Sequence, residues 1–359
     1  MTEDVEKGNL IYKLDVFFNS CILNGWKDSI VTLQTTKALP LWSEDLAISS
    51  RCIEAIASKA LSHPSKVSLS HSHSRRVRDD VSLCTGSESL RHKSTSSGWW
   101  AEDLADLSID LYWRTMIAIK SGGKTPSNLI GDALKIYASR WLPNIRKNVH
   151  HVKREKTESD SDSDSDSASE VNSKHRLVLE SIVSLLPAEK GAVSCSFLLK
   201  LLKAANILNA SASSKVELAT RVGLQLEEAT VNDLLIRSVS KSTNDMIYEV
   251  DLVMTILEHF MLQGQSPPTS PPRSRFAVER RRSRSAENIN FEFQESRRSS
   301  SASHGSKLKV ARLVDRYLQE VARDVNLPLS KFIVIAETIP DFARHDHDDL
   351  YRAIDIYLK

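Results

Sequence analysis

Four short stretches of this chain carry residue types that could bind a ligand. The first, Ser121 to Thr125, reads SGGKT and ends like a phosphate-binding loop. Such a loop needs a preceding strand and a further glycine five residues before Gly123, but Ala118 stands at that position within a predicted helix. Paired glycines are also typical of helix ends, so we predict a turn here and no nucleotide site.

The second stretch, DSDSDSDSASE, starts at Asp160 and has the aspartate spacing of a calcium loop's first ligands. Such a loop needs glycine at its sixth position and glutamate at its twelfth, where this chain has Ser165 and Val171. The pattern favours a solvated acidic tract whose serines, flanked by acidic residues, suit an acidophilic kinase. The predicted phosphorylation sites in this tract are Ser161, Ser163, Ser165 and Ser167.

The third stretch is HDHDD, from His345 to Asp349. Imidazoles and carboxylates can ligate metals, but no second ligand cluster lies nearby in the sequence. We therefore predict a polar turn, with Asp348 or Asp349 capping the final helix, and no metal site. The four cysteines form no CxxC pair, which predicts reduced thiols without a zinc site or a disulfide framework; they are Cys21, Cys52, Cys84 and Cys195.

The fourth stretch, from Arg280, reads RRRSRS. A basic Arg/Ser segment can bind RNA phosphates, and it can also be a basophilic kinase site whose phosphorylation cancels the local charge. The region has few RS repeats and few aromatic residues for base stacking, so regulation is favoured, and an RNA-associated scaffold stays as the alternative function. The predicted phosphorylation sites here are Ser283, Ser285, Ser299 and Ser300.

No other combination of residues suggests acid, base or nucleophilic chemistry, so we predict a protein that is not an enzyme, with no catalytic, cofactor-binding or metal residues. The chain has 359 residues, 41% of them hydrophobic, and a formal net charge of +2, which predicts no global attraction to DNA or membranes. No apolar run approaches the length of a membrane span, and the start, MTEDVEKGN, is unlike a signal peptide. These features predict an intracellular protein without a transmembrane segment.

The elements that would position these stretches are helices. Apolar residues recur at helical spacing through most of the chain, and no alternating run long enough for a sheet occurs. We predict an all-α fold, either a multi-helix bundle or an irregular α-solenoid, with long disordered insertions. One helix is predicted from Trp42 to Ala60 with Ser43 as its cap, and the six tryptophans are interpreted mainly as packing anchors.

The clearest helical signal runs from Lys174 to Ser211. Pro187 and Gly191 separate two apolar helices, and the Ser194 hydroxyl is expected to cap the second one. So much apolar surface predicts burial on several sides. The predicted core residues are Leu177, Ile182, Leu186, Phe197, Leu201, Leu202 and Leu208.

Composition divides the chain into seven predicted segments. Helical blocks cover 1–61, 99–145, 173–263 and 307–359. Between them lie a disordered linker at 62–98, an acidic Ser/Asp disordered insertion at 146–172 and a Pro/Ser/Arg-rich disordered linker at 264–306.

Several motifs, in one order, resemble the non-phototropic hypocotyl domain of plant BTB/POZ adaptor proteins. They include WKDSI from Trp26, RCIEAIASKA from Arg51, WWAEDLADLSIDLYWRTMIAIKS from Trp99, YASRWLP from Tyr137, ESIVSLLPAEKGAVSCSFLLKLLKAANILNAS from Glu180, RVGLQLEEATVNDLLI from Arg221, YEVDLV from Tyr248 and LYRAIDIYLK from Leu350. The resemblance covers nearly the whole chain and diverges mainly in the linkers.

The resemblance implies a plant protein of the root-phototropism class, a noncatalytic substrate-recognition and signalling adaptor in protein ubiquitination and in light or auxin signalling. In full-length relatives a BTB domain precedes this region and docks a cullin-type E3 ligase. The first residues, MTED, resemble the interior of such relatives, which also continue beyond IYLK, so we expect this chain to lack the BTB part and the C-terminal end. The implied partners are BTB-containing relatives, a cullin-type ligase reached indirectly, and photoreceptor kinases. The implied location is the cytoplasm, with peripheral attachment to the plasma membrane left open.

Overall fold

The computed structural model describes residues 2–62, 98–142, 164–239, 245–263, 304–344 and 346–359. Side chains are described for these residues except at positions 2–8, 164–169 and 341. Contacts within the chain divide it into two compact units, Met1–Val193 and Ser194–Lys359. The boundary falls between the two helices of the stretch that the sequence predicts to be one central block. Each unit is described by itself.

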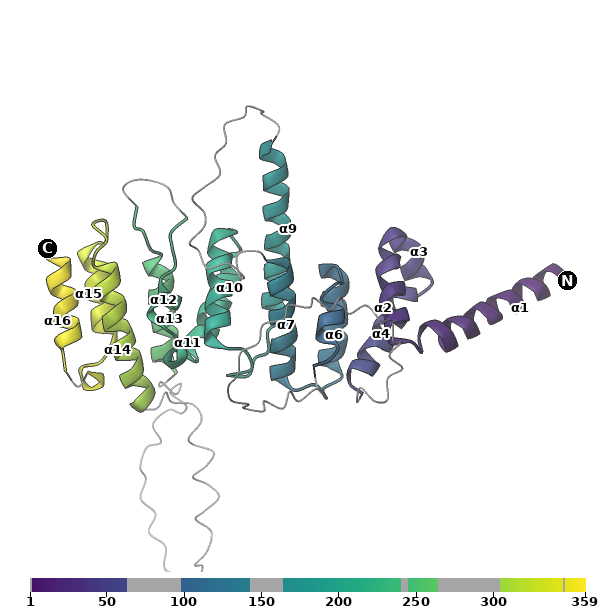
Figure 1. Cartoon of the computed structure of the whole chain (residues 1–359), viewed down its shortest axis with the longest axis horizontal. Helices are drawn as coiled ribbons and strands as arrows, with labels where there is room; N and C mark the ends of the chain where they lie inside the picture. Colours follow the sequence, from purple (N-terminus) through teal and green to yellow (C-terminus); the bar gives the residue numbers. More distant parts are fainter. Residues whose placement is uncertain (1, 63–97, 143–163, 240–244, 264–303, 345) are drawn as a thin grey trace, which may run out of the picture. The chain divides into compact units, whose positions relative to one another are not determined.

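The described part of unit 1 is helical (Figure 1). They are α1 (Thr2–Phe17), the π-helix η1 (Phe18–Ile22), α2 (Trp26–Thr35), the 3₁₀ helix η2 (Thr36–Ala38), α3 (Pro40–Asp45), α4 (Ile48–Ala60), α5 (Ala101–Leu104), α6 (Ile109–Ser121), α7 (Ser127–Trp141) and α9 (Asp164–Leu185). Helix α4 packs against α2 and α6, and α9 packs against α6 and α7. Figure 1 shows α1 extending away from α2, α3 and α4.

The core of unit 1 includes aromatic side chains brought together from distant parts of the chain. Trp26 is fully buried, and its Nε1 donates a 2.7 Å hydrogen bond to the Asp103 carboxylate. Tyr112 of α6 and Tyr137 of α7 stack with ring centroids 3.7 Å apart. Trp42, in contrast, is 67% exposed, so the prediction that the tryptophans are packing anchors is wrong for this one.

The helix predicted from Trp42 to Ala60 is two helices, α3 and α4. Ala47 separates them because it adopts a left-handed conformation, φ 54° and ψ 24°. Ser43 does not cap a helix; it lies inside α3, where its hydroxyl donates to the Pro40 carbonyl and accepts from the Ser49 hydroxyl. The break was not predicted because alanine is the best helix former.

The left-handed conformation of Ala47 allows the break between α3 and α4 to be tested by substitution. Ala47→Gly should raise the free energy of unfolding by up to about 1 kcal/mol, because the strain of a Cβ at positive φ is removed. Ala55→Gly, inside α4, is the matched control and should lower it by about 1 kcal/mol. Urea unfolding followed by tryptophan fluorescence measures both. Equal destabilisation by the two substitutions would contradict the left-handed turn.

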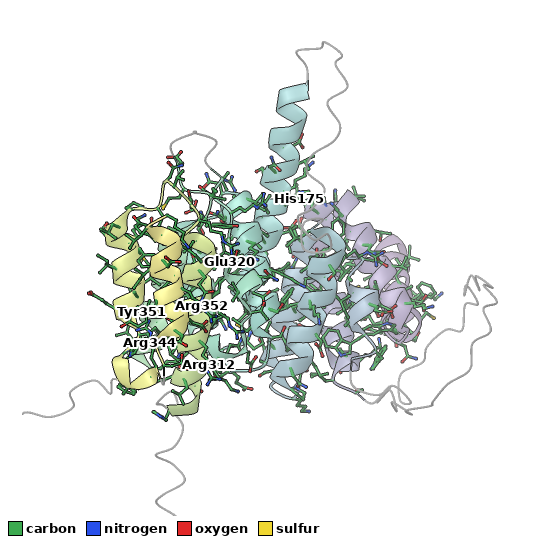
Figure 2. All side chains as sticks on the ribbon, turned by 60° about the vertical axis from the view of Figure 1, so that its left-hand side comes forward. His175, Arg312, Glu320, Arg344, Tyr351 and Arg352 are labelled. Atoms are coloured by element: carbon green, nitrogen blue, oxygen red, sulfur yellow. The ribbon has the colours of Figure 1, made fainter. Side chains whose placement is uncertain are left out.

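Helix α9 begins at Asp164, so the last part of the segment predicted to be a disordered insertion is helical. Acidic residues in a first turn interact favourably with the positive end of the helix dipole, which the composition argument did not weigh. Further along, Lys174 forms an (i, i+4) ion pair with Glu170 on the same helix. Both views show α9 extending beyond α6 and α7 (Figures 1 and 2).

Unit 2 is also helical. It contains α10 (Cys195–Ile207), α11 (Ala212–Gly223), η5 (Leu226–Glu228), α12 (Val231–Leu234), α13 (Val250–Leu262), α14 (His304–Val321), α15 (Leu329–Thr338), η6 (Asp341–Ala343) and α16 (Asp348–Tyr357). Helix α11 packs against α10 and α13, and α14 packs against α15 and α16. Across the described ranges the chain forms helices and no strand beyond one isolated bridge, Arg237 to Tyr248, which confirms the all-α prediction.

The predicted core residues are mostly buried. Those with side chains at most 3% exposed are Ile182, Leu186, Phe197, Leu201 and Leu202. Leu177 is 52% exposed, so its assignment to the core is wrong. It lies one position before the buried stripe of α9, on the face that carries the exposed Ser184. Leu208 is partly exposed because α10 ends at Ile207.

The sequence predicted the position of some helix starts but not which side chains cap them. Ser194 is the N-cap residue of α10, yet its side chain makes no cap hydrogen bond. A full capping box, which we had not predicted, begins α12: the Thr230 hydroxyl accepts from the Asp233 amide, and the Asp233 carboxylate accepts from the Thr230 amide. The spacing of a threonine followed three residues later by an acidic side chain is the signal for it.

Candidate interaction surfaces

The SGGKT stretch forms the end of a helix. Ser121 is the last residue of α6, Gly122 is its C-cap, and Gly123 has φ 63°, a left-handed value that favours glycine. The segment before it is a helix and not a strand. The predicted turn is therefore confirmed.

The predicted phosphorylation sites fall mostly outside the described residues. This holds for Ser161 and Ser163, and for Ser283, Ser285, Ser299 and Ser300 in the second linker. Ser165 and Ser167 lie in the first turn of α9. Their modification stays a prediction.

The HDHDD stretch leads into α16, which begins at Asp348. The N-cap residue is His347, and no side chain caps the helix, so the predicted cap by an aspartate is wrong. Asp349 instead accepts a 3.3 Å hydrogen bond from Gln319 Nε2 and lies 3.7 Å from Arg352 Nη1. Among the described residues, which exclude His345, no group of three or more His, Cys, Asp or Glu side chains could hold a metal ion.

Three of the four cysteines lie in the described part of the chain and are free thiols. Cys21 is exposed, whereas Cys52 and Cys195 are buried. Burial raises the pKa of the Cys52 thiol to about 11 and that of Cys195 to about 12. Both are therefore thiols rather than nucleophilic thiolates at neutral pH.

Alkylation tests this difference. With iodoacetamide at about pH 8, Cys21 should react while Cys52 and Cys195 stay unmodified, because burial blocks access and suppresses the thiolate. Peptide mass spectrometry measures each site. The same reaction in urea is the control and should modify every cysteine. Labelling of Cys195 in the folded protein as fast as Cys21 would contradict the buried assignment.

Unit 1 exposes large apolar side chains at its N-terminal end. We call the following set the apolar N-terminal surface: Leu10, Ile11, Tyr12, Leu14 and Phe17 of α1, with Leu39, Leu41, Trp42 and Leu46 around α3. Each is more than half exposed. Large apolar side chains left exposed in such number are typical of sites of protein association. No helix in the described ranges is long and apolar enough to cross a bilayer.

Unit 2 carries a polar hollow of about 170 Å³ between α14 and the segment from η6 to α16. We call it the C-terminal hollow. Its charged lining residues are Arg312, Asp315, Arg316, Arg344, Asp346 and Asp349. Figure 2 shows Arg312 and Arg344 towards the same end of α14 and α16, with Glu320 further along α14.

A buried ion pair lies beside this hollow. The Arg344 and Asp315 side chains are only 3% and 5% exposed. Arg344 Nε and Nη2 donate to the Asp315 carboxylate at 3.2 and 2.9 Å. The remaining guanidinium donors reach backbone carbonyls, Nη1 to Ile339 at 3.1 Å and Nη2 to Ala336 at 2.9 Å. The pair therefore ties α14 to the end of α15 and to η6, and Arg344 has every nitrogen engaged.

We did not predict the residues of this hollow from the sequence. Arg312 and Arg316 are one helical turn apart on the exposed face of α14, which is a pattern that periodicity can reveal. Asp315 and Arg344 are far apart in sequence, and only the packing of α14 against η6 brings them together.

A protein-family model for the NPH3 family matches residues 98–359. The chain belongs to the NPH3 family. A BTB/POZ domain-containing protein of Arabidopsis thaliana is 74% identical over the whole of this chain and 56% of its own length. The Arabidopsis phototropic-responsive NPH3 family protein NPY2 is 41% identical over the whole chain and 51% of its length. Root phototropism protein 3, from the same plant, is 34% identical over 56% of its length.

The chain thus spans about half the length of the curated relatives that it matches, with the whole of this chain aligned to each. This agrees with the predicted resemblance to the non-phototropic hypocotyl domain. No solved structure matches the chain.

Proposed function

We propose that this protein is a noncatalytic substrate-recognition and signalling adaptor that acts with a cullin-based E3 ubiquitin ligase in light or auxin signalling. The observation that carries the proposal is the family match over residues 98–359. The names of relatives support the physiological setting, since two are a phototropic-responsive protein and a root phototropism protein. The expected partners are BTB-containing relatives, the ligase through them, and photoreceptor kinases.

The apolar N-terminal surface supports association with another protein. Proteins rarely leave so many large apolar side chains exposed, because their burial against a partner is favourable at about 25 cal/mol per Å². Trp42 is the best anchor within it, since it is 67% exposed and aromatic side chains dominate interface energies.

Copurification tests the adaptor proposal. Tagged chain is incubated in plant extract with and without a recombinant BTB-containing relative, and cullin is detected by immunoblot. Cullin should be recovered only when the relative is supplied. Recovery without it, or no recovery in either case, would contradict the proposal.

A matched pair of variants locates the interface. Trp42→Glu should reduce recovery of the BTB-containing relative about tenfold or more, because it removes an aromatic anchor. Val325→Glu, at a 95% exposed apolar residue of unit 2, should leave recovery unchanged. Equal effects of the two variants would place the interface elsewhere.

The regulatory part of the proposal is phosphorylation of the two serine-rich tracts, around Ser161 to Ser167 and around Ser283 to Ser300. Each phosphate adds roughly −1.5 to −2 charges, so it would extend the charge of the first tract and reverse that of the second. Phosphosite mapping in plant extract from light-grown and dark-grown seedlings tests this. Absence of phosphate from both tracts in both conditions would remove regulation and leave the adaptor proposal standing.

A further inference from the structure

The C-terminal hollow contains charges that are already neutralised and charges that are not. Arg344 and Asp315 neutralise each other in the buried pair. Asp349 is held by Gln319 and lies within ion-pair distance of Arg352. These side chains shape the hollow but have little charge left for a ligand.

Two cations lining the hollow have no ion pair within the described part of the chain. They are Arg312 and Arg316, both exposed and one turn apart on α14, so their guanidinium groups can reach the same point. Lys309, exposed one turn earlier on the same helix, extends this basic face. The one acidic lining group without a partner of its own is Asp346. The net charge of the lining residues that form no ion pair is therefore positive.

From this arrangement we infer that the C-terminal hollow binds a phosphoserine side chain presented by an acidic peptide of a partner protein. A phosphoserine carries roughly −1.5 to −2 charges and three acceptor oxygens, which two forked guanidinium groups can hold bidentately. A single carboxylate carries only one negative charge, so it would balance the charge of only one of the two arginines. The peptide's acidic neighbours would lie along α14 towards Lys309.

The shape favours a peptide side chain over an anionic membrane. A hollow of about 170 Å³ admits one phosphate group, whereas a bilayer needs a broad basic face. The carboxylate of Asp346, which also lines the hollow, would repel a continuous anionic surface. The inference concerns unit 2 alone, so it does not depend on the ligase proposal, and loss of peptide binding leaves cullin recovery as a separate readout.

Fluorescence polarisation with the full chain tests the site. The probe is a short fluorescein-labelled peptide with one phosphoserine flanked by aspartates, compared with the same peptide carrying serine or glutamate. The phosphorylated probe should bind at least tenfold more tightly than either, and its affinity should fall as salt rises.

Substitutions test whether Arg312 and Arg316 bind the phosphorylated peptide. Arg312→Gln and Arg316→Gln should each weaken binding roughly fivefold to tenfold, and Arg316→Lys should weaken it less because charge remains while the bidentate fork is lost. Asp346→Asn should strengthen binding by a few fold, since it removes a repulsive carboxylate. Arg323→Gln is the matched control: Arg323 lies just after the end of α14, is exposed and pairs with Glu320, so binding should not change.

Three results would overturn the inference. The first is equal binding of the phosphorylated and unmodified peptides. The second is an equal loss for Arg323→Gln and Arg312→Gln. The third is Arg312- and Arg316-dependent binding to phosphatidylserine vesicles in place of the peptide. Because both arginines are exposed, circular dichroism should show the variants folded like the parent chain.

Discussion

Replacing Asp315 by asparagine should lower the free energy of unfolding by about 3 to 5 kcal/mol. The substitution leaves the Arg344 guanidinium 3% exposed and without its counter-ion. A buried charge that loses its partner carries most of its desolvation penalty uncompensated. The backbone carbonyls of Ile339 and Ala336 still accept from Arg344, but they do not neutralise it.

Urea unfolding followed by far-ultraviolet circular dichroism measures the loss for Asp315→Asn. All six tryptophans precede Pro143, so tryptophan fluorescence reports the unfolding of unit 1. Because Asp315 lies in unit 2, the free energy of unfolding should fall more when unfolding is followed by circular dichroism than when it is followed by fluorescence. Glu320→Gln, on the same helix, removes an exposed ion pair with Arg323 and should change stability by less than about 1 kcal/mol. The double variant Asp315→Leu with Arg344→Met should recover much of the stability, because it buries no charge. A loss below 1 kcal/mol for Asp315→Asn would contradict the buried pair.

Leu201→Asp should unfold unit 2, lowering its stability by several kcal/mol. Leu201 is fully buried on α10, so the substitution places a carboxylate in the apolar core of unit 2. The carboxylate either stays charged at a large desolvation penalty or takes up a proton, and both outcomes destabilise the fold.

Leu177→Asp is the informative comparison for Leu201→Asp. The sequence predicts both leucines to be core residues, but Leu177 is 52% exposed in the structure. Its substitution should change stability by no more than about 0.5 kcal/mol. Thermal melts of both variants by circular dichroism decide the matter. An unchanged melt for Leu201→Asp, or equal losses for the two, would contradict the observed burial.

Local patterns in the sequence predicted the kinds of element. Apolar residues at helical spacing indicated α10 and its buried Phe197 and Leu201, because a helix that is apolar over a wide face must be covered. Glycine signals were equally local: Gly123 and Gly191 both have positive φ, a conformation in which glycine pays no Cβ penalty. Motif order along the chain indicated the family that the comparisons confirmed.

Predictions from local sequence patterns were wrong where packing neighbours or helix ends determine the structure. Propensity could not place a break at Ala47, since alanine is the residue least expected in a left-handed turn. Acidic composition suggested disorder at Asp164, yet it also suits the first turn of α9. Periodicity assigned Leu177 to the core because it does not show how far around α9 the covered face extends, and Leu177 lies on the face of the exposed Ser184.

By itself, then, the sequence determined an all-helical NPH3-family chain, its helix-ending glycines and the apolar stripe of α10. Only the tertiary structure decided which charges are paired. Asp315 pairs with Arg344 because α14 packs against η6. Arg312 and Arg316, on the same helix, are exposed and form no ion pair within the described residues. The physical reason is range: helix propensity and periodicity act within a few residues, whereas burial and ion pairing depend on segments that meet only after folding.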